Sequence, residues 1–353
     1  MTAILVACVS GPDSLDPPPG STSLSPEFIT DVFTRNWEDD GKAASSVFAF
    51  NDGDTVAVDP SVQVGETAQR SGDTMWSVGQ WISTEGQWQR FVDVGDNQTA
   101  GQRNPEAVRT LGVSMAPYLG ALVGDFSPES LPGFGPSNPH APTWIDPNQN
   151  KSFEGSARVF ALINTDAEAG TYFTRAAMDR MLRYQEEYAA GPNAPDAAKK
   201  FERAGALAGL IDHGLRLGLG ASIADQSDVS KAACHRKEAA NAQLSDRGAG
   251  GIRDSSSDAY ADGVALGCSG SSELRFPNFA KVNYYVLSRM DIAPEKRDRY
   301  TEIFRGGGLR TWEDLQGSGD SERPDLTGLV NSLMGEVGAG MAFRDGYDGV
   351  TRE

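Results

Sequence analysis

The chain has 353 residues, which is enough for one large domain or two moderate ones with a substantial core. Its 49 acidic and 31 basic side chains give a net charge of −18, and its basic residues form no long run. Nucleic acid is therefore excluded as a partner, because binding phosphates requires a basic surface. No window of about 18 consecutive apolar residues occurs, so the sequence predicts no transmembrane helix.

The N-terminal segment carries the first candidate site. Residues 9–25 are rich in Gly, Pro, Ser and Asp, so residues 1–24 are expected to form a disordered tether. Within it, the run from Leu5 to Cys8 (Leu-Val-Ala-Cys) fits a bacterial lipobox, which makes Cys8 a candidate lipidation site. The residues before Cys8 are too few for a signal peptide, so this hypothesis requires a start further upstream. The alternative is an exposed cysteine in a tail.

A first helical domain is expected over residues 25–124. Ser25 as N-cap and Pro26 at the first helical position predict its first helix. Between 61 and 92, apolar residues recur three, four or seven positions apart, which predicts one or two helices. The stretch 47–58 is compatible with a helix end or with a short hairpin, and the helical surroundings favour the first.

The clearest helix start lies at Asn104, an N-cap residue that Pro105 follows. Pro117 falls inside this helix and is expected to kink or divide it near Ala116. Residues 125–150 then contain six prolines and no periodicity. Loops of this length and composition are often functional, so this one is the candidate partner surface.

A second helical domain is expected over residues 151–353. Thr165 with Glu168 has the spacing of a capping box, and residues 245–258 are expected to be flexible. The helices expected in this domain lie at 156–164, 165–190, 196–220, 276–290, 294–304 and 325–343. The fold class is therefore all-α: an irregular multi-helix bundle with long Pro- and Gly-rich loops and no fixed-period repeat.

Three stretches resemble a known family: "FITDVFTRNWEDDGKAASSVF" at 28–48, "NPEAVRTLGVSMAPYLGALVGDF" at 104–126, and the segment 160–214 that begins "FALINTDAEAGTYFTRAAM". They are similar to uncharacterised actinobacterial proteins labelled "TPR repeat region", some associated with type VII secretion and WXG-type proteins. The resemblance spans roughly residues 25–220. It implies an actinobacterial source, a helical body and a cell-envelope or secreted setting, and it supplies no catalytic residues.

The chain also departs from that family's associations. It has no Trp-x-Gly turn and no Tyr-x-x-x-Asp/Glu export signal, which argues against direct type VII export. It also has no 34-residue period, in contrast to a TPR array.

Cys234 and Cys268 form the second candidate site. If Cys8 carries lipid, these two cysteines lie in an oxidising compartment and are predicted to form one disulfide across the 245–258 segment. Such a bridge contributes ~3–4 kcal/mol by the loop-entropy relation. The alternative is two reduced thiols in a cytoplasmic protein.

Catalytic, metal and cofactor sites are not predicted. The three histidines, His140, His213 and His235, form no His-x-x-x-His or His-Glu-x-x-His motif, and no Cys-x-x-Cys occurs. His213 is expected near a helix C-terminus, where it would meet the helix dipole. The basic residues at 235–238 are interleaved with acids and indicate a solvated helix face. Nucleophile-elbow and phosphate-loop motifs are absent from the sequence.

Aromatic residues at helical spacing are expected in the core rather than in a binding groove. These are Trp76, Trp81, Trp88 and Phe91.

Together these observations predict a non-enzymatic cell-envelope protein that acts through protein–protein interaction. It would be secreted or anchored on the outer face of the plasma membrane through Cys8, and linked to a secretion or contact-dependent system. Two alternatives remain: a hydrolase or toxin-related module whose site the sequence does not reveal, and a cytoplasmic scaffold.

Overall fold

The computed structural model describes residues 24–49, 66–84, 86–125, 134, 153–247, 279–306, 308–311, 314–315, 326–338 and 341–351. Within these ranges the regular structure is almost entirely helical, with one two-stranded antiparallel hairpin. The all-α fold class is therefore confirmed.

The N-terminal part of the chain forms a series of short and medium helices. Ser25 caps the first of them, since its hydroxyl accepts a hydrogen bond from the Phe28 amide at 3.2 Å. The elements are α1 (Pro26–Thr34), α2 (Lys42–Ser45), η2 (Ser46–Phe48), α4 (Glu66–Ser83), α5 (Trp88–Val92), α6 (Ala100–Arg103), α7 (Pro105–Met115), η3 (Ala116–Tyr118) and α8 (Leu119–Leu122).

The predicted break at Pro117 is confirmed, because the 3₁₀ turn η3 separates α7 from α8. The predicted N-cap position at Asn104 is confirmed, because α7 begins at Pro105 directly after it. The Asn104 side chain does not cap α7; instead its amide nitrogen donates to the carbonyl oxygens of Phe33 at 3.0 Å and Arg35 at 2.7 Å. Asn104 therefore ties the end of α1 to the start of α7.

The second part of the chain contains the long helices α9 (Glu154–Ile163), α10 (Ala167–Ala190), α11 (Ala197–Gly220) and α12 (Gln226–Arg247). The predicted capping box of Thr165 and Glu168 is wrong by one residue. Asp166 is the N-cap of α10, since its carboxylate accepts from the Ala169 amide at 2.8 Å. The Thr165 hydroxyl instead accepts from the Gly101 amide at 3.1 Å, which joins α6 to the start of α10.

The C-terminal elements are α14 (Phe279–Arg289), α15 (Pro294–Arg299), β1 (Phe304–Arg305), β2 (Gly308–Leu309), α17 (Leu326–Glu336) and α18 (Ala342–Thr351). The helix expected at 294–304 ends at Arg299, and the chain then turns into the β1–β2 hairpin, where Gly306 has φ +59°. Of the alternative hairpin near 47–58, residues 46–48 form a 3₁₀ turn and residues 50–65 lie outside the described residues.

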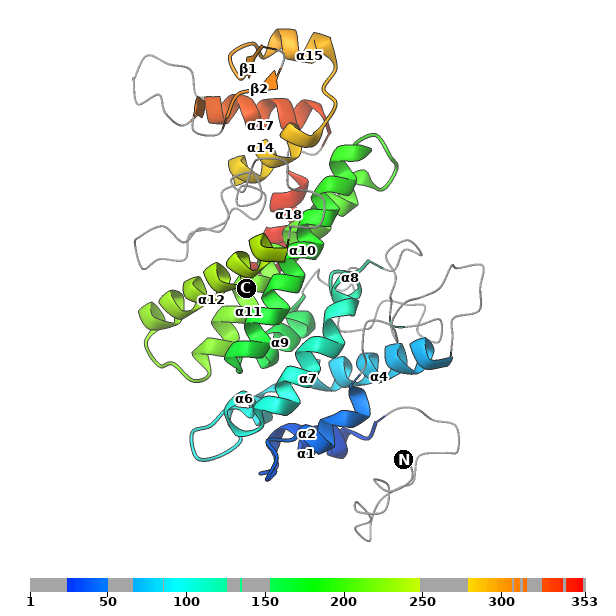
Figure 1. Ribbon diagram of the computed structural model, residues 1–353, viewed down its shortest axis with the longest axis vertical. Coiled ribbons are helices and arrows are strands. Elements are labelled where there is room, and N and C mark those ends of the chain that lie inside the picture. The colour runs from blue at the N-terminus through cyan, green and yellow to red at the C-terminus, as the bar shows by residue number, and fades with distance from the viewer. Residues whose placement is uncertain are drawn as a thin grey trace.

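The helices are arranged around α11 (Figure 1). It contacts α9, α10, α12 and α18. The N-terminal helices join the same body, since α4 packs on α9 and α7 packs on α10. Helices α14, α15 and α17 with the hairpin form a lobe at one end, and the chain then returns through α18 to α11 (Figure 1). Residues from 25–124 and from 151–353 both belong to the hydrophobic core cluster, and the division of the chain into two domains stays a prediction.

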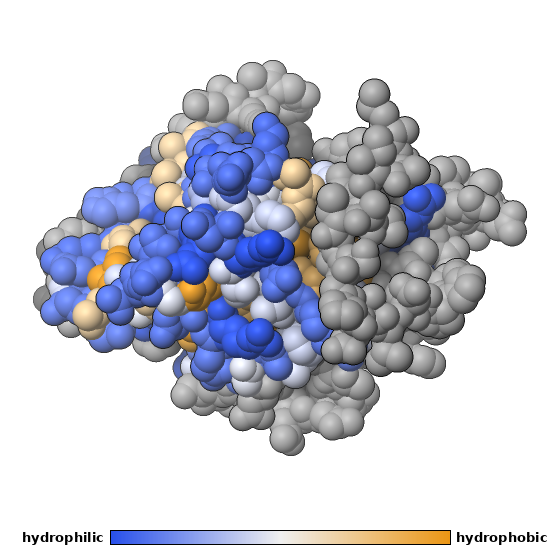
Figure 2. Space-filling model, turned by 90° about the horizontal axis from the view of Figure 1, so that it is seen from below, coloured by the Kyte–Doolittle hydropathy of each residue, from blue (hydrophilic) through white to orange (hydrophobic). Residues whose placement is uncertain are grey.

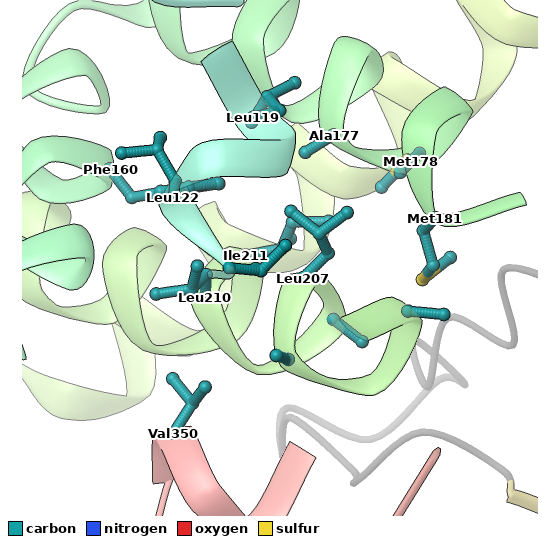
Figure 3. Close-up of a cluster of buried hydrophobic side chains, with 14 of the residues drawn as sticks. Leu119, Leu122, Phe160, Ala177, Met178, Met181, Leu207, Leu210, Ile211 and Val350 are labelled. Carbon is teal, nitrogen blue, oxygen red and sulfur yellow. The ribbon is translucent and has the colours of Figure 1, made fainter. Parts of the chain in front are cut away.

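Seen from the side of α1 and α2, the described residues at the surface are mostly hydrophilic, with hydrophobic ones in small separate spots (Figure 2). The interior is mostly apolar. Figure 3 shows one part of it, where side chains from α8, α9, α10, α11 and α18 meet. The labelled residues, all buried, are Leu119, Leu122, Phe160, Ala177, Met178, Met181, Leu207, Leu210, Ile211 and Val350.

Glycines let α11 approach two neighbours closely. A Cβ on Gly205 would collide with the Phe343 backbone of α18, and one on Gly218 would collide with the Ala161 backbone of α9. Gly209 and Gly214 repeat these two approaches, against α18 and α9 respectively. Gly214 follows Gly205, and Gly218 follows Gly209, by nine residues. At about 100° per residue, nine residues bring the chain to the opposite side of the helix. The helix therefore presents two opposed small-residue faces.

The approach of α18 to α11 gives a first prediction. Gly346 lies against the Glu202 carbonyl, and an added Cβ would overlap that oxygen, whereas Gly349 of the same helix has open space. We expect Gly346→Ala to lower the free energy of unfolding by about 1–3 kcal/mol, because the backbones must separate. Gly349→Ala should leave it unchanged or raise it by up to about 1 kcal/mol, since Ala favours helix.

Urea unfolding followed by circular dichroism measures both variants. Equal stability of the two would contradict the close α11–α18 approach.

Candidate functional site

Lys237 is a buried lysine on α12. Its side chain lies on the same helix face as Val229, Ala233 and Ala240, and all four residues are buried. These positions recur at intervals of three or four, which is the spacing of an inward helix face. The expectation of a solvated face at 235–238 is therefore wrong for Lys237, which is 2% exposed.

Asp212 of α11 receives this lysine. The Lys237 Nζ contacts Oδ1 of Asp212, and the Tyr347 hydroxyl of α18 donates to Oδ2 at 2.7 Å. Asp212 is 5% exposed and Tyr347 is 2% exposed. One carboxylate thus joins α11, α12 and α18, and we call Lys237, Asp212 and Tyr347 the lysine cluster.

Burial sets the electrostatics of the lysine cluster. It lowers the pKa of Lys237 to about 7, because the ammonium loses hydration. It raises the pKa of Tyr347 to about 12 for the corresponding reason. Near neutral pH, part of the Lys237 population is therefore an unprotonated amine, which is a nucleophile.

Arg236, next to Lys237, also points inward. Its Nη1 donates to the Asn164 carbonyl oxygen at 2.6 Å, where α9 connects to α10. Burial lowers the pKa of this guanidinium. Helix α12 is therefore held by cations at two places, although its outer residues His235 and Glu238 are exposed and pair with each other at 3.5 Å.

A second buried charge lies at Asp125, where α8 ends. Gly124 turns the chain with φ +73°, and the fully buried Asp125 side chain then faces α10 and α11. Its carboxylate lies 2.8 Å from Arg203 Nη1 and 3.6 Å from Arg180 Nη2, and it accepts from the Tyr184 hydroxyl at 2.6 Å. Burial raises the pKa of Tyr184. These residues, the Asp125 cluster, hold α8 against the two long helices.

The cysteines predicted as sites are only partly described. Cys8 and Cys268 lie outside the described residues, so lipidation of Cys8 stays a prediction. Cys234 lies on α12 and is disulfide-bonded. Its partner lies outside the described residues, and the pairing with Cys268 stays a prediction.

The two described histidines lie on different helices, His213 on α11 and His235 on α12. His213 lies in the interior of α11, which continues to Gly220, so its expected place at a helix end is wrong. His140 lies outside the described residues, as does most of the 125–150 segment predicted as a partner surface. Of that segment, Phe134 is buried and stacks on Tyr118 with 5.1 Å between ring centroids.

The aromatic residues of α4 and α5 belong to the core. Trp88 and Phe91 are buried, and Trp76 and Trp81 are half-buried against the hydrophobic core. The Trp81 indole nitrogen donates to the Thr30 hydroxyl at 2.9 Å, which holds α4 on α1.

Among the described residues, no three His, Cys, Asp or Glu side chains lie together as a metal ion would need. No helix in the described ranges is both long and apolar enough to cross a membrane.

No family model matches the chain, and no curated protein or solved structure matches it.

Sequence reasoning missed both clusters, although a signal exists for one. Asp212 interrupts the apolar run "ALAGLIDHGLRLGLG" of α11, and Lys237 continues the inward spacing set by Val229 and Ala233. A carboxylate and a lysine on inward faces of successive helices indicate a buried pair. No local pattern predicts the Tyr347 contact, because it joins α11 to the end of the chain.

The Asp125 cluster gives a second prediction. Asp125→Ala should lower the free energy of unfolding by about 3–5 kcal/mol, because it leaves Arg203 and Arg180 without their buried carboxylate. Asp179→Ala is the matched control, since it removes a carboxylate from an exposed ion pair with Arg183 within α10. It should cost at most about 1 kcal/mol.

Chemical unfolding of the two variants against the unchanged chain gives this comparison. Similar losses for both would show that Asp125 contributes no more than a surface charge.

Proposed function

We propose that this protein is a non-enzymatic, helical protein of the cell envelope that acts through contacts with other proteins. The observation that carries the proposal is that the buried charges lie at contacts between helices. Asp212 and Lys237, and likewise Asp125 with its arginines, connect helices in the interior. Buried charges that pair with one another fix how helices pack. Their role is to hold the bundle, which leaves its outer faces for function.

The disulfide-bonded Cys234 supports the setting. Disulfides persist in oxidising compartments and are rare in the cytoplasm. A location on the outer face of an actinobacterial plasma membrane, with Cys8 as the lipid anchor, agrees with this bond. The same bond disfavours the alternative of a cytoplasmic scaffold with reduced thiols.

The character of the surface supports polar contacts with a partner. The coloured residues of the face in Figure 2 are mostly hydrophilic, and the side chains of Glu38, Asp39 and Asp40 beside α2 are exposed. The whole chain carries a net charge of −18. A surface of this kind favours association that charge accelerates and salt weakens.

A third prediction tests the anchor. In the native host, the mature chain should begin at Cys8, carry added acyl mass and sediment with membranes. Cys8→Ser should move it to the soluble fraction, because the substitution removes the thiol that would carry the lipid. Cys234→Ser is the control and should leave the protein with the membranes.

Intact-mass measurement of the detergent extract, before and after reduction, decides the question. An unmodified Cys8 in a cytoplasmic chain with three alkylatable thiols would overturn the envelope setting.

The partner contact has its own test. A membrane-impermeant amine-reactive crosslinker applied to intact cells should join the chain to a discrete protein, and the yield should fall in high salt. Protection of the chain from this reagent until the cells are lysed would contradict a surface location.

A further inference from the structure

We propose that Lys237 and Asp212 condense to a covalent amide bond, so that α12 is joined to α11 through their side chains. The proposal goes beyond the function proposed above and does not depend on it. It starts from the contact between Lys237 Nζ and Asp212 Oδ1 within the helical interior. Both side chains are almost fully buried, at 3% and 6% exposure.

The charged form of this pair is costly where it lies. Two opposite charges taken out of water lose hydration that their attraction only partly restores. Transfer of one proton from the ammonium to Oδ1 removes both charges and gives a neutral amine beside a carboxylic acid. Burial acts in this direction, since it lowers the pKa of Lys237 to about 7.

The neutral pair is placed for reaction. Because Nζ contacts Oδ1, the amine also lies close to Cγ, the carbon it would attack. Intramolecular placement of this kind replaces a collision between two molecules and raises the effective concentration of the amine by many orders of magnitude. Apart from the lysine contact, Asp212 Oδ1 makes no hydrogen bond within the described part of the chain.

Tyr347 supplies stabilisation for the transition state. Its hydroxyl donates to Oδ2 at 2.7 Å, on the oxygen that does not leave. Negative charge develops on Oδ2 when the amine adds to Cγ, and a fixed donor at that atom lowers the barrier. In the product Oδ2 becomes the amide oxygen and can keep the same hydrogen bond. Tyr347 is therefore a stabilising group and not the nucleophile.

The step balances without any co-reactant. The bond from Nζ to Cγ forms, and the bond from Cγ to Oδ1 breaks. Two of the three ammonium protons leave with Oδ1 as water, and the third remains on the amide nitrogen. No oxidant, metal or energy source takes part.

Mass spectrometry of the purified full-length chain tests the proposal. After reduction and denaturation, the intact mass should be lower than that of the sequence by one water. A tryptic digest should contain a branched peptide that joins the Asp212 peptide to the Lys237 peptide, uncut after Lys237. A full sequence mass, with linear peptides only, would overturn the proposal.

Two variants separate this bond from other losses of water. Lys237→Met removes the amine and should restore the full mass, whereas ring closure of an aspartate to a succinimide would persist. Tyr347→Phe should leave a measurable fraction of chains at full mass, because the donor to Oδ2 is lost. A loss of water that survives Lys237→Met would contradict the proposed bond. The presence or absence of the branched peptide in the unchanged chain tests the proposed bond even where a variant fails to fold.

Discussion

The close approach of α11 to α9 and α18 is the constraint on which the rest of the structure depends. Gly205 and Gly209 admit the backbone of α18, and Gly214 and Gly218 admit that of α9 on the opposite face. Helices that approach this closely make many weak dispersion contacts along the two faces of α11. Asp212 lies between the two glycine pairs. The approach of α18 is therefore also what brings the Tyr347 hydroxyl to that carboxylate.

Buried charges then fix where the remaining helices attach. Helix α12 is mostly polar, and among its described side chains few large ones are buried, so Lys237 and Arg236 contribute much of what positions it. The Asp125 cluster does the same for α8 at the point where the chain enters the 126–133 stretch. Such pairs contribute little net stability compared with apolar contacts, but a partner left alone in the interior is strongly unfavourable. They therefore select one helix arrangement, and a covalent Lys237–Asp212 bond would make that selection permanent.

The sequence predicts the helices that carry their own local signals. Ser25 and Pro26 mark α1, the Pro117 break divides α7 from α8, and strong apolar periodicity marks α10 and α11. Of α12 it predicts only a solvated helix face at 235–238, and neither the bounds nor the buried side of the helix, because its polar residues show almost no apolar stripe. The sequence also places the cap of α10 at Thr165 and continues the helix at 294–304 into the β1–β2 hairpin. In both places neighbouring residues could take the same role, and tertiary contacts decide which one does. The clusters combine residues up to 135 positions apart, and no local pattern carries that information.

Hydrogen exchange measured by mass spectrometry on the intact chain tests the central role of α11 most directly. If α11 holds α9, α12 and α18 together, its amides can exchange only when the whole bundle opens. Peptides from 201–219 should then exchange last of all the described segments, and Gly346→Ala should speed them more than peptides of α14 or α17. Exchange of α11 before the helices around it would contradict the account.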